Sequence, residues 1–241
     1  MRIDKYLVDV LKIESRAKAQ QLIEAGCVKV NNIVVYHKNY DVKEDANVEV
    51  NSTINYVSRG AQKLIGAIAA FHIDFNKKIV LDVGSSTGGF TQVALLNNAK
   101  HVYAVDVGTN QLHESLRNNP RITLYENTHL KDIDLKMFKQ HIDIVIADLS
   151  FISVKNLLEK ITKLFKYKVE IVILIKPQFE LSKEIVCKYD GVIKLPPLHK
   201  QAVEDVLGYA RRHKFKVLGV CQSPITGKDG NVEFFAHLEW K

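Results

Sequence analysis

Six short apolar runs recur through the second part of the chain, and they constrain the fold more than any other feature. They cover residues 79–83, 102–107, 144–148, 170–176, 216–221 and 233–240. The stretches between them are long enough for helices, so strands and helices are expected to alternate. This alternation predicts an α/β fold with a doubly wound, Rossmann-like sheet. Ligands of such sheets bind at the carboxyl ends of the strands, where the strand order reverses.

The first of these runs is followed by a loop of small residues, GSSTGG at 84–89. The loop lies between a predicted strand and a predicted helix over 91–98, so its backbone N–H groups can approach a ligand without a Cβ in the way. No lysine follows the glycines, which argues against a P-loop, and Ser86 replaces the second glycine of a dinucleotide fingerprint. The loop therefore predicts a ligand site of another kind.

Two aspartates, Asp82 and Asp106, end successive predicted strands beside this loop. Asp82 can accept a hydrogen bond from the amino group of an amino acid, which suits S-adenosylmethionine and is superfluous for a pyrophosphate. Asp106 ends the strand whose acidic residue binds ribose hydroxyls in Rossmann-like folds. The alternative is that each aspartate caps a helix or forms a loop ion pair. We predict a cofactor site made of Asp82, Gly84, Ser86, Gly88, Gly89, Phe90, Asp106, Val107 and Asp148.

The first 50 residues have a different pattern. Helical spacing over 3–11 is followed by a second helix that begins at the N-cap Ser15 and stops at Gly26. The alternating stretch CVKVNNIVV then predicts a hairpin that turns at Asn31 and Asn32. We expect a small α+β domain over 1–50, a linker over 51–57 and the α/β domain over 58–241.

This first region resembles the RNA-binding domain named after ribosomal protein S-four. The resemblance is carried by Ser15, Arg16, Ala19, Leu22, Ile23, Gly26, Val28, Val30 and Asn31. In that fold, Arg2, Lys5, Arg16 and Lys18 would lie on one face and bind phosphates. The alternative is that they are solvated surface charges. The net charge of +7 is compatible with a polyanionic partner.

Nearly the whole chain is similar to the TlyA family, also called hemolysin A. The motifs that carry this similarity are YVSRGAQKL, VLDVGSSTGGF, VYAVDVG, IADLSFIS, LIKPQFE and KDGNVEFF, in this order. The family joins the S-four domain to an FtsJ-like methyltransferase domain, which methylates ribose 2′-hydroxyls of ribosomal RNA with S-adenosylmethionine. The resemblance implies a cytidine of large-subunit RNA as the target, with small-subunit RNA as a second candidate. It also implies a catalytic tetrad of Lys63, Asp148, Lys176 and Glu233.

The residue types of the tetrad fit this chemistry. A ribose hydroxyl is a poor nucleophile at neutral pH, so an enzyme must align it with the activated methyl group and help its proton leave. Lys176 ends an apolar run, and partial burial near a second cation would make it a better base. Lys63 could hydrogen-bond the hydroxyl, while Asp148 and Glu233 orient the lysines. The roles within the tetrad stay interchangeable at this point.

Several other functions are disfavoured by what the sequence lacks. Asp148 is followed by Leu-Ser-Phe rather than the Pro-Pro-aromatic motif of base N-methylation, and neither Cys187 nor Cys221 lies in the Pro-Cys context of a pyrimidine C-methyltransferase. Three scattered cysteines suggest no disulfide and no metal site. The absence of long apolar runs predicts a cytoplasmic protein with no membrane partner. Two alternatives stay open: a ribosome-assembly factor with an inactive methyltransferase fold, and a membrane-active hemolysin.

Overall fold

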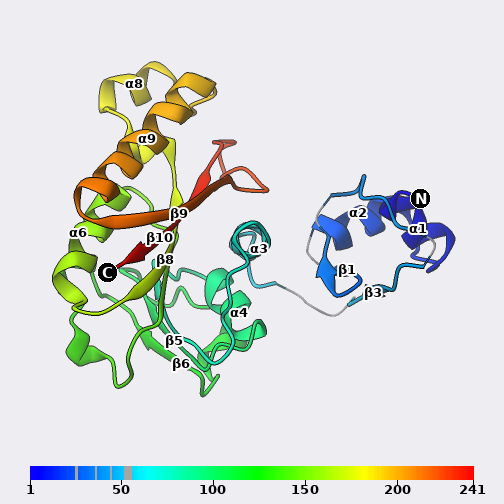
Figure 1. Cartoon of the computed structure of the whole chain (residues 1–241), viewed down its shortest axis with the longest axis horizontal. Coiled ribbons are helices and arrows are strands. Elements are labelled where there is room, and N and C mark those ends of the chain that lie inside the picture. Colours follow the sequence, from blue (N-terminus) through cyan, green and yellow to red (C-terminus); the bar gives the residue numbers. More distant parts are fainter. Residues whose placement is uncertain (25–26, 36, 44, 52–55) are drawn as a thin grey trace.

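The computed structural model describes residues 1–24, 27–35, 37–43, 45–51 and 56–241, except for the side chains of Gln21 and Glu24. These residues form a small α+β unit and a larger α/β unit, each with a hydrophobic core of its own (Figure 1). The fold class expected from the sequence is therefore confirmed. Gly26, where the second helix is predicted to stop, lies outside the described residues.

The small unit packs two helices on a three-stranded antiparallel sheet. Its elements are α1 (Ile3–Asp9), α2 (Arg16–Glu24), β1 (Val28–Val30), β2 (Ile33–Val34) and β3 (Val48–Val50), with the strand order β2-β1-β3. Asn31 and Asn32 have φ angles of 49° and 65°, and both form the turn between β1 and β2. The predicted hairpin is confirmed. Asparagine suits the turn, because it tolerates this left-handed conformation better than most residues.

The helices of the small unit begin where the sequence predicts. The Oγ of Ser15 accepts a hydrogen bond of 3.1 Å from the backbone N–H of Lys18, which caps the start of α2. Ile3 and Leu7 of α1 and Ile23 of α2 are fully buried against the sheet. The first helix ends at Asp9 rather than at Leu11, which is exposed and has no core to pack against.

The large unit is built on a seven-stranded sheet with the order β6-β5-β4-β7-β8-β10-β9. The strands are β4 (Ile79–Val83), β5 (His101–Val105), β6 (Ile122–Tyr125), β7 (Ile144–Ala147), β8 (Val169–Ile175), β9 (Phe215–Gln222) and β10 (Phe234–Trp240). β4 to β8 are parallel, and β10 inserts antiparallel between β8 and β9. All six predicted strands are present within one or two residues. The half-buried edge strand β6 is an addition that the sequence interpretation missed.

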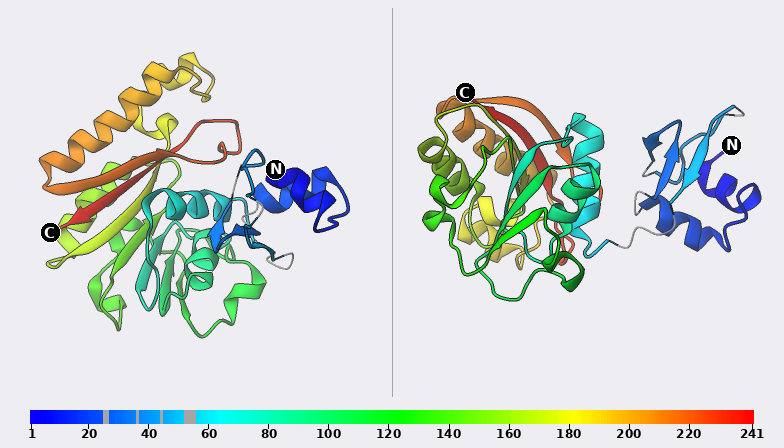
Figure 2. Two further views of the ribbon diagram at one scale, coloured as in Figure 1. Left: turned by 45° about the vertical axis from the view of Figure 1, so that its right-hand side comes forward. Right: turned by 90° about the horizontal axis from the view of Figure 1, so that it is seen from below.

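Helices cover both faces of this sheet (Figure 1, Figure 2). One face carries α3 (Gly60–Phe71) and α4 (Gly89–Leu96), and the other carries α6 (Val154–Leu164) and α9 (Pro196–Arg212). The shorter helices are α5 (Glu114–Arg117), α7 (Pro177–Glu180) and α8 (Lys183–Lys188), with 3₁₀ turns η1 (Leu130–Asp132) and η2 (Leu135–Met137). Because the central strands are buried on both faces, they read as continuous apolar runs.

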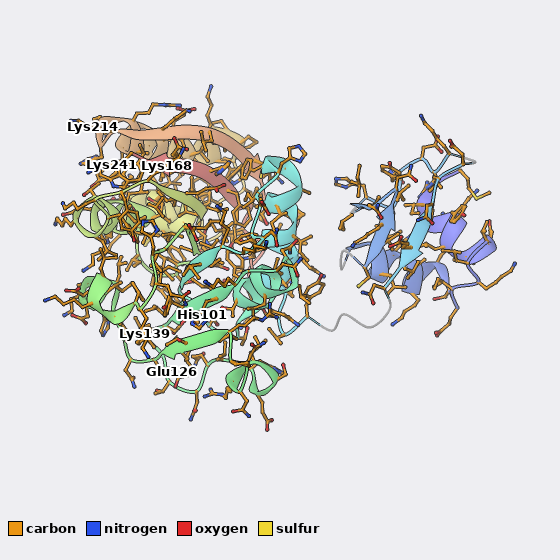
Figure 3. All side chains as sticks on the ribbon, turned by 60° about the horizontal axis from the view of Figure 1, so that its bottom comes forward. His101, Glu126, Lys139, Lys168, Lys214 and Lys241 are labelled. Atoms are coloured by element: carbon orange, nitrogen blue, oxygen red, sulfur yellow. The ribbon has the colours of Figure 1, made fainter. Side chains whose placement is uncertain are left out.

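The strand order reverses at β4, which lies between β5 and β7. The carboxyl ends of β4, β7 and β8 therefore share one edge of the sheet, where ligands bind in this architecture. At the opposite edge, Trp240 of β10 is paired with Val169 of β8 and with Phe215 of β9. This edge is marked by the lysines next to these residues in the chain, Lys168, Lys214 and Lys241 (Figure 3). Among the described residues, no helix is long and apolar enough to cross a membrane.

Candidate active site

A cavity of about 440 Å³ opens at the carboxyl edge of the sheet. It lies where the loop after β4, the ends of β7 and β8, the start of α3 and the β9–β10 connection meet. It is lined by Ser58, Arg59, Gly60, Lys63, Gly84, Ser85, Ser86, Thr87, Gly89, Phe90, Asp148, Ser150, Lys176, Thr226 and Lys228. A cavity of this size, at this place in a doubly wound sheet, fits a small-molecule ligand.

Three residues of the predicted tetrad, Lys63, Asp148 and Lys176, line this cavity, and the fourth, Glu233, is paired with Lys63. Lys63 projects from α3, Asp148 follows β7, Lys176 follows β8 and Glu233 directly precedes β10. The Nζ of Lys63 lies 2.7 Å from Oε2 of Glu233 and 3.6 Å from Oδ2 of Asp148. The Nζ of Lys176 lies 2.7 Å from Oδ1 of Asp148. The charges therefore alternate in space from Glu233 through Lys63 and Asp148 to Lys176.

The tetrad is largely withdrawn from water. Lys63 and Lys176 are each 8% exposed and Glu233 is 2% exposed, whereas the Asp148 side chain keeps 21% of its surface accessible. Burial of single charges would be very costly, but two lysines against two carboxylates compensate one another. The most accessible member is the aspartate between the lysines, so a ligand can reach the centre of the charge row.

Small residues bring the β9–β10 connection close enough to complete the tetrad. A Cβ on Gly66 of α3 would lie 2.6 Å from Cγ of Pro224, and a Cβ on Gly227 would lie 2.7 Å from Oε1 of Glu233. Real Cβ atoms do not approach other atoms so closely, so larger residues at either position would displace the connection. Glu233 is therefore positioned by contacts that no local sequence pattern specifies.

Ser150 is a site residue that the sequence interpretation missed. Its Oγ accepts a hydrogen bond of 2.8 Å from Nζ of Lys176. It stands two residues after Asp148 on the same loop, and this spacing is the signal that could have identified it. Lys176 is thus held by two neighbours from the β7 loop, Asp148 and Ser150.

The glycine loop serves the packing of the chain as well as the cavity. Gly84 has a φ of 80°, and a Cβ there would lie 3.0 Å from the backbone oxygen of Asp148. Gly88 has a φ of 92°, but a Cβ there would collide with Leu112 and Leu116 rather than with anything in the cavity. Of the predicted cofactor residues, Gly84, Ser86, Gly89, Phe90 and Asp148 line the cavity, whereas Asp82, Gly88, Asp106 and Val107 do not.

Asp82 lies behind the cavity lining and is fully buried. Its Oδ2 accepts a hydrogen bond of 2.6 Å from Oγ1 of Thr91, whereas its Oδ1 has no hydrogen-bond partner among the described residues. Burial raises the pKa of Asp82 to about 7, and the nearby carboxylates of Asp148 and Asp106 act in the same direction, while the Thr91 hydroxyl opposes them. A buried carboxyl with an unused oxygen next to this loop fits a site for a cationic ligand.

Asp106 shapes the loop from the neighbouring strand. Its carboxylate accepts backbone N–H bonds of 2.7 Å from both Ser86 and Gly108. Ser86 itself has a φ of 46°, so this contact supports an otherwise unfavourable backbone conformation. Val107 beside it is 58% exposed. Asp106 therefore orders the glycine loop, and each of its oxygens keeps a further lone pair for a hydroxyl group.

The predicted RNA patch of the small unit contains an acid that the sequence interpretation overlooked. Arg2 and Arg16 both lie 2.9 Å from Oδ2 of Asp4, whose side chain is buried. Burial opposes ionisation, but the hydrogen bonds and charges of both arginines lower the pKa of Asp4 to about 2. Lys5 and Lys18 are exposed. Asp4 thus fixes the two arginines side by side and neutralises part of their charge.

No group of His, Cys, Asp and Glu side chains that could hold a metal ion is found in the described part of the chain.

Comparison with known proteins shows which family this chain resembles. Residues 56–240 match the model of the FtsJ-like methyltransferases, and residues 1–48 match that of the S4 domain. Hemolysin A of Brachyspira hyodysenteriae is 41% identical over 99% of both chains. The 16S/23S rRNA (cytidine-2′-O)-methyltransferase TlyA of Mycobacterium tuberculosis is 39% identical over 98% of this chain and 89% of its own. The chain belongs to the TlyA family.

A solved structure supports the same membership. The structure of a hemolysin-named protein from Streptococcus thermophilus is 34% identical, with a TM-score of 0.73, over 99% of this chain and 88% of that chain. The resemblance to the TlyA family predicted from the sequence is thus confirmed, and the chain carries the methyltransferase domain of that family.

Proposed function

We propose that this protein transfers the methyl group of S-adenosylmethionine to the 2′-hydroxyl of a cytidine in large-subunit ribosomal RNA. The observation that carries the proposal is the row of Glu233, Lys63, Asp148 and Lys176 beside a glycine-loop cavity. A matching relative is named for cytidine 2′-O-methylation. The unused oxygen of Asp82 and the size of the cavity support a cationic cofactor.

Gly84, Ser86, Gly89 and Phe90 would hold the cofactor, which supplies a methyl group already activated by its sulfonium when it is bound there. The ribose oxygen would take up this methyl group. The hydroxyl proton must then leave. The task of the chain is therefore to orient the hydroxyl and accept its proton.

Lys176 is placed to accept that proton. Its Nζ lines the cavity, where it donates a hydrogen bond of 2.8 Å to Oγ of Ser150 and lies 2.7 Å from Oδ1 of Asp148. Lys63 is paired with Glu233, and its ammonium group can donate to the ribose oxygen as negative charge develops there.

Two aromatic rings near Lys176, the exposed Phe151 and the half-buried Phe179, offer a surface for the target base. Phe151 is 88% exposed, and its ring centroid lies 5.4 Å from that of Phe179, whose ring in turn lies 5.8 Å from Nζ of Lys176. A nucleotide that is turned out of its helix can stack on such a surface.

The test uses large and small ribosomal subunits from cells that lack the protein, with methyl-labelled S-adenosylmethionine. We expect label in large-subunit RNA, at one cytidine, on the ribose. A synthetic RNA of that region with a single deoxyribose at the modified nucleotide should bind but accept no label. Methyl transfer to the deoxy substrate at the parent rate would place the methyl group on the base and refute the proposal.

The two alternatives predict different results. An assembly factor with an inactive methyltransferase fold would bind the subunits without any transfer. The intact tetrad argues against it, because an inactive site has no need to bury two lysines and two carboxylates together. A membrane-active hemolysin would release dye from liposomes at low protein concentration, and the described residues contain no membrane-spanning helix.

A further inference from the structure

The cavity carries more positive charge than the tetrad uses. Its charged lining residues are Arg59, Lys63, Asp148, Lys176 and Lys228. Within the tetrad, the two lysines are balanced by Asp148 and Glu233. Arg59 and Lys228 remain as surplus cations at a site that otherwise has no net charge.

We propose that Arg59 and Lys228 form a phosphate-binding subsite for the phosphate on the 3′ side of the ribose that is methylated. This inference rests on the proposed function, since it presumes an RNA substrate. It assigns a ligand to two residues that neither the cofactor loop nor the catalytic tetrad requires.

Neither cation is paired with an acid in the described part of the chain. Among the described residues, no ion pair involves Arg59 or Lys228, and the Nζ of Lys228 makes no hydrogen bond there. Arg59 donates one bond of 3.3 Å from Nη2 to the backbone oxygen of Thr226, and both side chains belong to exposed residues. Their charges are therefore available to an anion from solution.

The cofactor does not complement the positive charges of Arg59 and Lys228. S-adenosylmethionine has a sulfonium and an amino group against one carboxylate, so it is a net cation at neutral pH. Two surplus positive charges in the same cavity work against its binding as a whole. They are useful only for a second ligand of opposite sign, and a polynucleotide is such a ligand.

The covalent structure of RNA dictates where that second ligand has its charge. The 2′-oxygen and the 3′-oxygen are on adjacent carbons of the ribose, so a pose that brings the 2′-hydroxyl to Lys176 also brings the 3′-phosphate into the cavity. Without a cation there, the phosphate would face the carboxylate of Asp148 in a partly desolvated site, which is unfavourable. Arg59 and Lys228 remove that obstacle and fix the strand by its backbone.

The loop that carries Lys228 is held in place before any ligand arrives. Gly227 donates a backbone bond of 2.8 Å to Asn231, whose side chain accepts from the N–H of Ile193 at 2.8 Å and donates to Gly191 at 2.9 Å. Arg59 ties the same loop to the start of α3 through Thr226. A fixed loop lowers the entropic cost of placing the lysine on a phosphate.

The experiment compares Lys228→Gln with Lys214→Gln, an exposed lysine at the opposite edge of the sheet (Figure 3). The two edges are separated by the length of β8, roughly 23 Å for its 7 residues at about 3.3 Å each. Binding to unmethylated large subunits is measured over a range of salt concentrations. Binding of S-adenosylmethionine and of S-adenosylhomocysteine is measured by calorimetry.

We expect Lys228→Gln to weaken subunit binding roughly five- to tenfold at low salt and to make the slope of log K against log salt shallower by about 0.7 to 0.9. The affinity for S-adenosylmethionine should rise. It should rise more than that for S-adenosylhomocysteine, which lacks the sulfonium charge. Lys214→Gln should leave the preference between these two ligands at the parent value.

Two results would overturn the subsite. Equal losses of affinity for both cofactor forms, with an unchanged salt slope, would assign the cations to the carboxylate of the cofactor. An unchanged salt slope together with unchanged cofactor binding would leave them without a ligand. Arg59→Lys separates charge from loop anchoring, because it keeps the cation and loses the guanidinium contact with Thr226. If the parent protein transfers no methyl group while Lys228→Gln still flattens its salt slope, the proposed reaction fails and the phosphate site stands.

Discussion

Lys63 and Glu233 form an ion pair of 2.7 Å between Nζ and Oε2, although one residue lies on the first helix of the large unit and the other directly precedes its last strand. Both ends are almost fully buried. This contact joins the two ends of the methyltransferase domain beside the cavity. The domain must therefore be complete before the tetrad exists, and the stability of the fold is coupled to the assembly of the site.

The first prediction concerns that ion pair. Lys63→Met removes the cation and leaves Glu233 buried beside an apolar side chain, so the free energy of unfolding should fall by about 3 to 5 kcal/mol. Adding Glu233→Gln to Lys63→Met removes the unpaired charge and should restore part of that loss. Urea denaturation of the parent, both single variants and the double variant measures the coupling. If the loss of unfolding free energy in the double variant equalled the sum of the losses in the two single variants, Lys63 and Glu233 would have no interaction energy.

A second prediction concerns Glu180, which holds the two catalytic loops together. Its Oε2 accepts a bond of 2.6 Å from Oγ of Ser153, and its Oε1 accepts a bond of 2.8 Å from the N–H of Val154. Burial raises the pKa of Glu180, although both of these donors favour its carboxylate form. Glu180→Gln has only one oxygen for the two donors, so the loop after Asp148 should shift relative to Lys176.

We expect Glu180→Gln to lower kcat about tenfold while KM for S-adenosylmethionine stays near the parent value, because the loop geometry and not the glycine loop is disturbed. Ser153→Ala, which removes only one of the two donors, should give a smaller loss of kcat. A parallel loss of cofactor affinity and thermal stability, without a separate effect on kcat, would show that Glu180 is merely structural.

Much of this architecture can be predicted from the sequence, for a physical reason. Carboxyl ends of parallel strands share one edge of a sheet, so residues that end neighbouring parallel strands are close in space whatever their separation in the chain. Asp148 and Lys176 are such residues. The S-R-G and G-N-V-E-F motifs add Lys63 and Glu233 only through family resemblance, because nothing local specifies their contact.

Other features depend on packing that the sequence does not reveal. Gly88 belongs to a loop whose pattern predicts room for a ligand, yet it accommodates Leu112 and Leu116. Asp4, an isolated acid in a basic segment, gives no periodic signal, yet it organises Arg2 and Arg16. Each of these depends on which side chain reaches a given position from another segment, and that is decided by tertiary structure.

A third prediction follows from the lowered pKa of Asp4. A carboxyl group whose pKa is lowered on folding stabilises the folded state above its unfolded pKa of 3.8, and this contribution disappears as the pH falls through about 2. Asp4→Asn should therefore lower the stability of the small unit at pH 5 to 7. The difference from the parent should shrink as the pH falls below 4 and vanish near pH 2. Far-ultraviolet circular dichroism of both proteins across this range provides the measurement, and a difference independent of pH would contradict the ionic origin.

The fourth prediction tests the base. Lys176→Ala should leave the binding of cofactor and RNA near the parent values and slow methyl transfer by the roughly 10²- to 10⁴-fold that is typical of a lost acid–base group. Lys176→Arg should not restore the rate, because a guanidinium group stays protonated. Single-turnover transfer to ribosomal subunits separates the chemical step from product release. An arginine variant with the parent rate would show that position 176 needs only a positive charge.

The last prediction uses Asp82 to test the cofactor site without any RNA. Its pKa of about 7 lies above the value of 3.8 for an unfolded aspartate, so the stability that the protonated Asp82 gives the folded protein is lost as the pH rises from 3.8 to about 7. A bound cation nearby offsets that loss and lowers the pKa, so binding of S-adenosylmethionine should release a proton from Asp82 near neutral pH. The affinity should therefore rise between pH 5.5 and about 7.5 and then level off. Calorimetry in buffers of different ionisation enthalpy counts the protons, and Asp82→Asn, which keeps the shape of the side chain but cannot ionise, should show neither the release nor the pH dependence. If the parent bound the cofactor with equal affinity across this range and released no proton, Asp82 would not sense the cofactor's charge, and its unused oxygen would lose its functional interpretation.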